Sequence, residues 1–417
     1  MIEILKTHIE EQIGLKIKNR GDCELLSNAV LQILDIHISY NTIRRMYNLA
    51  PYTKPNTRTL NTFAQFIGYK NYNHFIQTYT YKIKYKLNQE VYKALSQEDE
   101  DDIIFLVTKT KKSSEDFSAF IILLTRELLY HKNYNLLNKI FNLNELSFNN
   151  FSYSEALYFG NSIGLFFRRN SNINNVLLKN INFINCVYLT FVDYSCLNKY
   201  FGNLAKLLFQ NPPNLEIRIF SASILSFKDY LNDIKKENAT YNKIDFSLIY
   251  SKKIHPILCS RLIALMLLKD KSKTIEVLNK YFELHHEKHQ LIDYSFELFT
   301  SAILSKNIIM MKYLIDKVKI SSKINYYYQK QHLNSFYLMC MFYYRLINDG
   351  KSERQYISLF NLNNIYINYE EYILIFYQIY LFNSNKGALE NKNQYFKLAE
   401  KLNYKYFNKD FFLNYFN

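Results

Sequence analysis

Glycine and proline are scarce in this chain, and their scarcity restricts the folds that it can adopt. Only 8 glycines and 5 prolines occur in 417 residues. Folds rich in β-sheet need many tight turns, in which glycine and proline supply the backbone conformations, whereas both residues weaken helices. A hydrophobic content of 48% provides ample apolar surface for burial and excludes global disorder. The composition therefore predicts an all-α protein of two or three domains or a repeat array.

The chain is basic, and its charge favours a polyanionic partner. Lys and Arg number 52 against 37 Asp and Glu, which gives a net charge of +15. Nucleic acid is the first partner that such a balance indicates, and a membrane surface is the second. Residues 1–96 carry 13 Lys and Arg and 7 Asp and Glu, a net charge of +6, so the positive excess is spread along the chain.

Three further features of the sequence indicate a cytoplasmic protein without a membrane partner. The first residues mix acidic with apolar side chains and so do not form a signal peptide. The longest apolar run, 119–124, is far too short to cross a bilayer. The five cysteines form no CxxC pair, and we expect them to be reduced and buried, as is usual in the cytoplasm.

Hydrophobic periodicity near the N-terminus predicts five short helices. The first is expected over residues 2–13, with Gly14 at its C-terminal end. Asp22 and Ser39 are the expected N-caps of the second and third helices, and Gly68 is expected to end the fourth, before a short fifth helical turn. The residues expected to face inward from the first four helices are Leu5, Ile9 and Ile13; Leu26, Val30, Ile33 and Leu34; Tyr40, Ile43 and Tyr47; and Leu60, Phe63, Ala64 and Ile67.

Helix–break–helix units fill most of the remaining chain and predict an irregular α-solenoid. Two such units, starting at Leu262 and Leu298, align so that Leu268 is matched with Leu304. Periods of roughly 34 to 46 residues are typical of helical repeats, in which each pair of helices buries its face on the next pair. No unit carries the full tetratricopeptide consensus, so we describe the predicted repeats as tetratricopeptide-like helical hairpins.

These patterns divide the chain into three parts. A small helical domain is expected over residues 1–80, a connecting helix over 81–112, and the repeat domain over 113–417. The acidic run at 96–102 falls in the connecting part. We interpret it as a helix N-terminus capped by Ser96, because carboxylates are favourable at the positive end of a helix dipole.

Motifs for catalysis and for phosphate binding give little support to an enzyme. The P-loop pattern G-x-x-x-x-G-K-[ST] and the dinucleotide pattern G-x-G-x-x-G are both absent. His285, His286 and His289 form the one notable cluster, but the second His comes one residue too early for a zincin motif. We expect a charged, solvated segment at this cluster, and we predict no enzyme activity, no metal site and no cofactor.

A Tyr-rich stretch at 324–332 is a candidate lining for a groove that binds a peptide or protein partner. The concave face of an α-solenoid is its usual binding surface, and tyrosine is common at interfaces. Packing into the core is the alternative interpretation of these residues. The neighbouring Met310 and Met311 are assigned to the core on their helical spacing.

The expected helix after Ser39 carries the clearest functional pattern. Asn41, Arg45 and Asn48 would share its outer face, because its apolar residues occupy the inner one. Arg and Asn are the side chains that pair with guanine and adenine edges in the major groove. The loop and helix start that follow supply candidates for phosphate contacts. The predicted DNA-binding residues are Asn41, Thr42, Arg44, Arg45, Asn48, Lys54, Asn56 and Arg58.

Nine residues between 20 and 75 follow a known pattern: Ser39, Thr42, Ile43, Arg45, Pro55, Thr59, Leu60, Ala64 and Gly68. Through these residues, the segment 20–75 resembles the Cro/phage-repressor (XRE-type) helix-turn-helix family. In that family a recognition helix leads through a proline-containing loop to a helix that ends in glycine. Two departures stand out here: the stretch from Ala29 to Thr42 is about one helical turn longer than the tight turn of the family, and the longer loop after Asn48 lacks the usual glycine.

A domain of this kind followed by tetratricopeptide-like helices is similar in layout to peptide-sensing bacterial transcription regulators. The resemblance implies a regulator that binds double-stranded DNA, with repeats that bind a peptide or protein partner or mediate dimerisation. A homodimer would match the way in which helix-turn-helix proteins read paired half-sites. The alternative is a non-enzymatic helical scaffold or adaptor whose N-terminal domain contacts protein rather than DNA.

Overall fold

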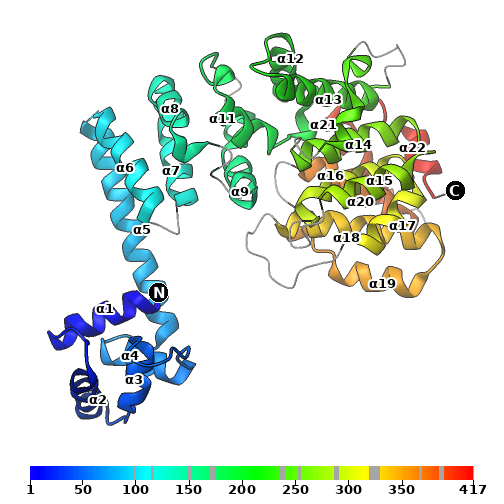
Figure 1. Cartoon of the computed structure of the whole chain (residues 1–417). Coiled ribbons are helices and arrows are strands. Elements are labelled where there is room, and N and C mark those ends of the chain that lie inside the picture. Colours follow the sequence, from blue (N-terminus) through cyan, green and yellow to red (C-terminus); the bar gives the residue numbers. More distant parts are fainter. Residues whose placement is uncertain are drawn as a thin grey trace. The chain divides into compact units, whose positions relative to one another are not determined.

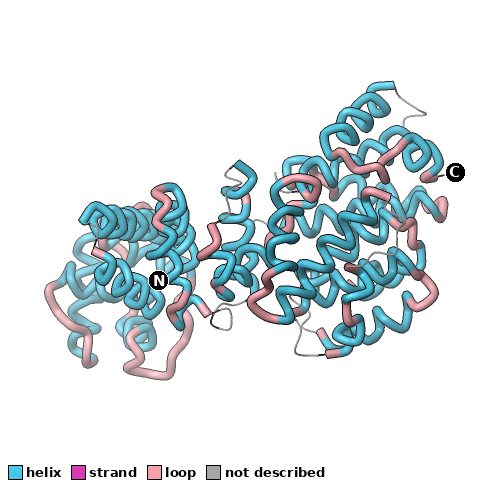
Figure 2. Tube along the Cα trace, turned by 90° about the horizontal axis from the view of Figure 1, so that it is seen from above, coloured by secondary structure: helices cyan, strands magenta, loops and turns pink. Residues whose placement is uncertain are grey.

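Helices and loops make up the described part of the computed structural model, and no strand occurs there (Figure 2). The predicted all-α fold is confirmed. The chain divides into an N-terminal unit, Met1–Ile103, and a C-terminal unit, Ile104–Asn417, with the boundary inside the predicted connecting segment. The structure describes residues 1–97, 99–113, 117–147, 150, 153–169, 174–233, 240–251, 255–285, 291–318, 329–365, 369–384 and 389–416.

The N-terminal unit encloses an apolar core between short helices. Helix α2 packs against α3 and α4, and α4 also packs against α1 and α5. Fully buried residues of this core include Leu26, Ile43 and Phe63, each with 0% exposure. The helices, labelled in Figure 1, are α1 (Ile2–Ile13), α2 (Arg20–Leu34), α3 (Tyr40–Met46), α4 (Thr57–Phe66) and α5 (Tyr72–Gln97).

Several predicted helix ends of this unit are confirmed, because their capping chemistry is local. Gly14 ends α1 in the left-handed conformation, with a φ of 67°. Gly68, one residue beyond the C-cap of α4, also has a positive φ, 88°. The Ser39 side chain caps α3 by accepting a hydrogen bond from the backbone N–H of Asn41, at 3.2 Å.

The predictions for α2 were wrong in two details. The N-cap is Asn19 and not Asp22: the Asn19 side chain accepts a hydrogen bond from the Asp22 N–H at 3.1 Å, and the Asp22 carboxylate accepts one from the Asn19 N–H at 3.0 Å. This reciprocal capping box starts the helix earlier than predicted. Ile33 does not face inward, since 59% of its surface is exposed, whereas Val30 is buried as expected.

The region after α4 also differs from the prediction. Helix α5 is continuous from Tyr72 to Gln97, where a short turn and a separate connecting helix were expected. Ser96 does not cap the helix that follows, because its hydroxyl donates to the carbonyl of Lys93 within α5. Asp99 caps instead, and its carboxylate accepts hydrogen bonds from two backbone N–H groups of the next helix, at 2.9 and 3.2 Å.

The C-terminal unit is a succession of α-helices with short 3₁₀ and π turns between them. The longer helices are α6 (Glu100–Ser113), which begins just before the boundary, α7 (Phe117–Tyr130), α8 (Tyr134–Phe141), α9 (Tyr153–Gly164), α12 (Tyr200–Gln210), α13 (Leu215–Leu231), α14 (Pro256–Lys269), α15 (Thr274–Leu284), α16 (Leu291–Leu304), α17 (Ile308–Lys317), α18 (Gln329–Leu346), α19 (Gly350–Leu359), α20 (Glu370–Ser384) and α21 (Leu389–Leu402). The short elements are η1 (Asn144–Leu146), α10 (Phe166–Arg169), η3 (Leu177–Lys179), α11 (Ile181–Phe183), the π-helix η4 (Ile184–Leu189), η5 (Tyr194–Cys196), η6 (Tyr241–Lys243), η7 (Phe246–Tyr250), η8 (Leu362–Asn364) and α22 (Lys409–Asn414).

The two units aligned in the sequence are consecutive helical pairs, α14 with α15 and α16 with α17. Helix α14 packs against α16, which in turn packs against α18. The breaks within the pairs also meet, because the Asn307 side-chain amide donates to the Thr274 hydroxyl at 3.0 Å. The matched Leu268 and Leu304 are both buried, as are Met310 and Met311. The regular superhelix of a solenoid stays a prediction.

The end of the chain packs back onto the middle of the C-terminal unit, which no sequence pattern indicated. The Tyr404 hydroxyl accepts a hydrogen bond from the Leu197 N–H at 2.9 Å and donates to the Tyr194 carbonyl at 2.7 Å. The Tyr406 hydroxyl donates to the carbonyl of Leu304 at 2.9 Å. Segments more than a hundred residues apart in sequence are therefore joined, and Figure 1 shows the red C-terminal segment beside the green and yellow helices.

Candidate nucleic-acid interface

Helix α3 is held to the core along one side only. Ile43 and Met46 are completely buried there, and Tyr40 and Tyr47 are half-buried. The Tyr47 hydroxyl donates a hydrogen bond to the carbonyl of Lys6 in α1, at 3.2 Å, which ties the end of α3 to another helix. Met46 was missed as a core residue, although its spacing from Ile43 fits the inner face of a helix.

The opposite side of α3 presents polar side chains to solvent. Asn41 and Arg45 are exposed one turn apart, and Thr42 is partly exposed. Arg45 forms no hydrogen bond and no ion pair with any described residue. A guanidinium with all of its donors available can bind a guanine edge or a phosphate in a bidentate manner. The structure therefore brings together Asn41, Thr42 and Arg45 as predicted.

Arg44 is hydrogen-bonded within the domain, and Asn48 is placed differently from the prediction. The Arg44 guanidinium donates to the Asn41 side chain on α3 and to the Leu49 carbonyl in the loop, both at 3.4 Å. Asn48 lies beyond the last turn of α3 with a φ of 60°, so it does not continue the outer face. Asn adopts this left-handed conformation more readily than most residues. Asn48 thus ends α3 in the conformation that glycine most often adopts after a helix.

The start of α4 provides a second group of exposed polar residues. Lys54 and Arg58 are exposed, and neither side chain forms a hydrogen bond or ion pair with a described residue. Asn56 is the N-cap of α4, and its side-chain oxygen accepts a hydrogen bond from the Thr59 N–H at 2.8 Å. The side-chain NH2 group of Asn56 is then the part that remains available to a partner. Basic side chains beside the N-terminus of a helix form a suitable environment for phosphate.

The longer turn before α3 is anchored to the core through one of its residues, Ile38. Asp35 ends α2 with a φ of 55°, and Ile38 is buried. The buried Ser27 hydroxyl donates a hydrogen bond to the Ile38 carbonyl at 2.6 Å. This bond links α2 directly to the residue before the N-cap of α3, and so it fixes where α3 starts relative to α2.

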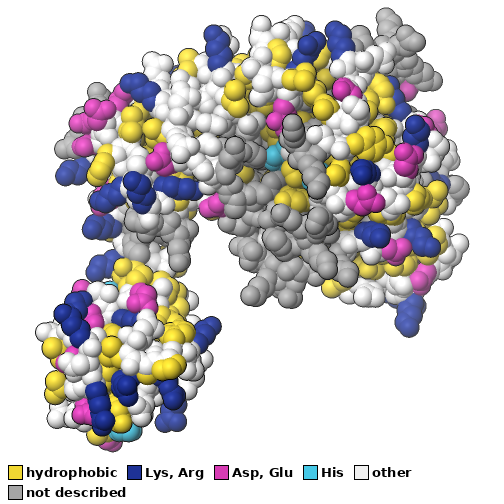
Figure 3. Space-filling view, in the orientation of Figure 1, with side chains coloured by type: hydrophobic (Ala, Val, Ile, Leu, Met, Phe, Trp, Pro, Cys, Tyr) yellow, Lys and Arg dark blue, Asp and Glu magenta, His cyan; other side chains and the backbone are white. Residues whose placement is uncertain are grey.

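Charge is distributed unevenly within the N-terminal unit. Residues 1–35 contain six acids and four Lys and Arg, and three of those cations form ion pairs: Lys6 with Glu3, Lys16 with Glu10, and Arg20 with Glu24. Residues 36–89 contain eight Lys and Arg and no acid. None of these eight whose side chain is described forms an ion pair. The visible face of this unit carries both basic and acidic side chains (Figure 3). The positive charge of α3 and α4 therefore lacks internal compensation.

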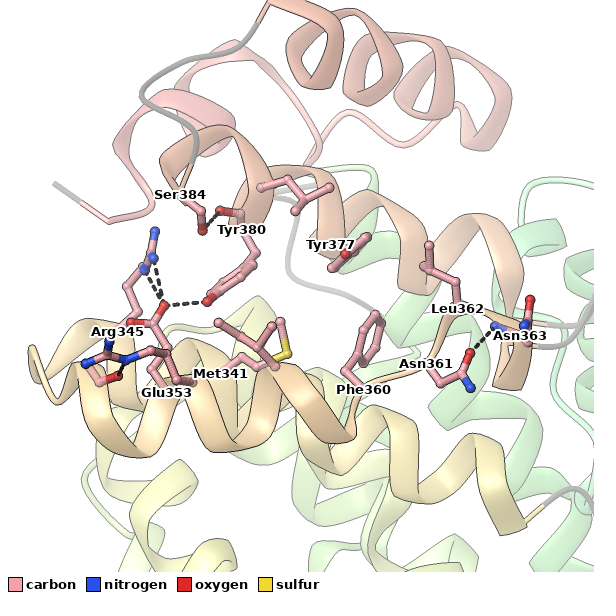
Figure 4. A pocket seen from close by; sticks show the side chains of 14 residues that line it. Met341, Arg345, Glu353, Phe360, Asn361, Leu362, Asn363, Tyr377, Tyr380 and Ser384 are labelled. Atoms are coloured by element: carbon pink, nitrogen blue, oxygen red, sulfur yellow. Dashed lines mark hydrogen bonds and ion pairs between the residues drawn. The ribbon is translucent and has the colours of Figure 1, made fainter.

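A cavity of about 800 Å³ in the C-terminal unit is a second candidate site (Figure 4). At one end, Arg345 donates to Glu353 at 2.7 Å, and the Tyr380 hydroxyl is also hydrogen-bonded to Glu353. At the other end lie the side chains of Asn361 and Asn363. The cavity is lined between these ends by apolar residues that include Met341, Ile357, Phe360, Leu362 and Tyr377.

The predicted histidine cluster and Tyr-rich stretch are only partly described. His286, His289 and residues 319–328 lie outside the described residues. His285 is buried, so the prediction of a solvated segment was wrong at this residue. His332 packs in the core with its ring stacked on Phe296 and its Nδ1 2.7 Å from Asp293 Oδ1, so the end of the Tyr-rich stretch does not line a groove.

A G-x-S-x-G pattern occurs at residues 160–164, within α9. The Ser162 hydroxyl donates to the Tyr158 carbonyl at 2.7 Å, as in an ordinary helix, and no strand precedes it in the described structure. A catalytic nucleophile elbow needs a strand-to-helix turn. The glycines have a packing role instead: a Cβ atom at Gly160 would lie 1.9 Å from the hydroxyl of Thr190.

Comparison with known proteins finds no matching family model, no matching curated protein and no matching solved structure. No helix among the described residues combines the length and apolar character needed to cross a membrane. In the same part of the chain, no group of three or more His, Cys, Asp or Glu is placed to hold a metal ion.

Proposed function

We propose that the protein is a transcriptional regulator whose N-terminal unit binds double-stranded DNA through α3 and the start of α4. The observation that supports it most is the uncompensated positive charge of residues 36–89, which contrasts with the paired charges of residues 1–35. Unpaired cations on a surface attract the phosphates of a duplex, and their binding releases counterions.

The geometry of α3 gives each exposed residue a role in this proposal. Asn41 and Arg45 would contact base edges, because they lie on the solvent-facing side of a helix whose other side is buried. Lys54, Arg58 and the amide of Asn56 would contact phosphates beside the N-terminus of α4. Arg44 would have to leave its contacts with Asn41 and with the Leu49 carbonyl, which are long and weak, in order to reach the duplex.

The C-terminal unit would then bind a peptide or protein partner or mediate dimerisation. The cavity between α18, α19 and α20 supports a peptide ligand, because it combines an apolar middle with charged and amide groups at its ends. Backbone amides and side chains of a short peptide would match this pattern. The alternative proposal, a helical adaptor whose N-terminal unit contacts protein, shares the same surface but needs no duplex.

The test is the affinity of the full-length protein for duplex DNA from the region beside its own gene, measured by fluorescence anisotropy. Arg45→Ala should weaken binding by about 1–3 kcal/mol, because it removes a base-contacting guanidinium. Lys206→Ala, which removes an exposed cation of α12 in the C-terminal unit, is the matched control and should leave the affinity unchanged. An equal loss of affinity in both variants would show that the attraction to DNA is non-specific. If the wild type binds no duplex, the regulator proposal fails and the adaptor proposal remains.

A further inference from the structure

A second cavity of the C-terminal unit, about 600 Å³ in volume, is surrounded by basic side chains. It lies where η5 and the start of α12 meet α20 and α21. The residues that matter for its chemistry are Arg168, Ser195, Lys199, Tyr200, Glu371 and Lys401. We call it the basic cavity. Neither the DNA proposal nor the peptide proposal uses any of its residues, and the inference below does not rest on them.

Arg168 is held rigidly at the wall of the basic cavity. Its Nε and Nη2 donate to the two carboxylate oxygens of Asp193, at 2.8 and 2.7 Å. Asp193 is completely buried, and the Tyr200 hydroxyl donates to the same carboxylate at 2.9 Å. Bidentate pairing of this kind fixes the plane of the guanidinium. The Nη1 group forms no hydrogen bond with a described residue and is available to a ligand.

Positive charge exceeds negative charge around the basic cavity. Lys401 pairs with Glu371 at 2.6 Å, and Arg168 lies 3.8 Å from the same carboxylate. Burial is the largest single influence on Glu371 and raises its pKa, but the interactions with Lys401, a backbone N–H, Ser195 and Arg168 together outweigh burial and bring the pKa below its usual value. With Lys199 exposed at the rim, three cations face two carboxylates, one of which, Asp193, lies behind Arg168.

Three polar groups at the basic cavity lack a well-formed side-chain hydrogen bond to a described residue: the first turn of α12, the Ser195 hydroxyl and Glu371 Oε2. The N-cap residue of α12 is Lys199, whose side chain has no acceptor, so no side-chain hydrogen bond caps the first turn of an 11-residue helix. The Ser195 hydroxyl is buried, with 5% of the residue exposed; it lies close enough to the Glu371 carboxylate to lower the pKa of that group, but the two form no hydrogen bond of normal geometry. An anion at the start of α12 would satisfy the helix end and the hydroxyl together.

We propose that the basic cavity binds a small phosphorylated molecule. The phosphate would lie against the first turn of α12, between Lys199 and Lys401, and would accept hydrogen bonds from Ser195 and from Nη1 of Arg168. A cavity of about 600 Å³ is large enough for an organic group in addition to the phosphate. Glu371 Oε2, which forms no hydrogen bond of normal geometry with a described residue, would accept one from a hydroxyl or amino group of that organic part.

The experiment measures binding of inorganic phosphate by isothermal titration calorimetry, with chloride used to keep the ionic strength constant. The parent protein for this experiment is the full chain with Arg44→Ala and Arg45→Ala, so that the proposed DNA surface contributes least to the signal. Each further substitution is made in this parent. Lys199→Gln should weaken phosphate binding about tenfold, which corresponds to the loss of one charge-assisted hydrogen bond. Lys206→Gln lies on the same helix, removes the same charge away from the cavity and should bind phosphate like its parent.

Ser195→Ala should also weaken phosphate binding, because it removes the buried hydroxyl without changing charge. Circular dichroism verifies that each variant is folded, and Lys199 is exposed, so its replacement should not disturb the core. The proposal is overturned if phosphate shows no saturable binding at millimolar concentrations, if Lys199→Gln and Lys206→Gln bind equally, or if acetate binds as tightly as phosphate. Loss of DNA binding in the parent has no effect on any of these outcomes, so the two proposals fail separately.

Discussion

The two units of this protein place their charged groups differently. Among the described residues of the N-terminal unit, the buried polar side chains are Lys6, Ser27 and Thr62, and the rest of the core is apolar. The C-terminal unit buries whole ion pairs: Arg261 lies 2.7 Å from Glu297, with each side chain 4% exposed. Burial of charge is expensive unless the groups are paired and hydrogen-bonded.

Charged groups therefore have a structural role in the C-terminal unit, whereas the exposed cations of the N-terminal unit are available for binding. In the C-terminal unit, the Arg261–Glu297 pair joins α14 to α16, and the Tyr194 hydroxyl of η5 is hydrogen-bonded to the same Glu297. Such a cluster requires a particular arrangement of helices, because an unpaired buried charge is strongly unfavourable. In the N-terminal unit, the cations of α3 and α4 remain on the surface and are available to a partner. We therefore expect mutations of charge to affect stability in one unit and binding in the other.

The largest effect is expected from Glu297→Gln. Removal of this carboxylate leaves the guanidinium of Arg261 buried without its counter-ion, which should lower the free energy of unfolding by about 3–5 kcal/mol. Urea unfolding followed by circular dichroism measures the change. The surface pair Arg20–Glu24, at 2.8 Å in the N-terminal unit, supplies the control, and Glu24→Gln should cost less than about 1 kcal/mol. Equal effects of the two substitutions would contradict the comparison.

The second-largest effect is a pH dependence of folding stability, and it arises from His255 in the C-terminal unit. Burial, with smaller contributions from Arg261 and His285, lowers the pKa of His255 to about 3. Between that value and the ordinary pKa of about 6.5, the unfolded chain binds a proton that the folded chain does not. Stability is therefore complete above this window and is lost as the pH falls through it.

The variant His255→Asn isolates this contribution. Asn can replace the His255 Nδ1 that accepts the Ile257 N–H at the start of α14, but it does not titrate. Between pH 7 and pH 5 the wild type should lose about 2 kcal/mol more stability than the variant. Chemical unfolding at the two pH values measures this difference. Parallel losses in both proteins would mean that His255 is protonated in the fold.

A smaller effect is expected within the N-terminal unit from Asn19→Ala. The substitution removes the side-chain acceptor for the Asp22 N–H and should destabilise α2 by about 1 kcal/mol. Hydrogen exchange followed by mass spectrometry should show faster exchange in peptides of α2 and unchanged exchange in α16. Faster exchange in both would contradict the assignment of the two helices to separate units.

Local chemistry explains why much of the N-terminal fold was predictable. Ser39, Gly14 and Gly68 act within a few residues of their own helix ends, so their roles follow from sequence. Asp22 was assigned the wrong role because both Asn19 and Asp22 can cap, and only the backbone geometry shows which side chain accepts from which N–H. Ile33 is apolar and correctly spaced, yet no neighbouring helix covers it.

Long-range contacts explain what could not be predicted. The basic cavity combines Arg168 and Lys199 with Glu371 and Lys401, which are about two hundred residues further along the chain. Hydrophobic periodicity shows which face of a helix is buried, but it does not show which distant helix packs against that face. Of the predicted DNA-binding residues, Asn41 and Arg45 lie on the expected face. Asn48 does not, because α3 ends at Met46 and Asn48 itself has the left-handed conformation.

The salt dependence of DNA binding tests the central proposal most directly. The logarithm of the association constant of the wild type for a duplex should fall linearly with the logarithm of salt concentration. The variant Arg44→Ala/Arg45→Ala should bind far more weakly, with a slope reduced by about two, while Lys206→Ala/Lys405→Ala should match the wild type. Binding without salt dependence, or identical slopes for the wild type and the α3 variant, would contradict the proposal.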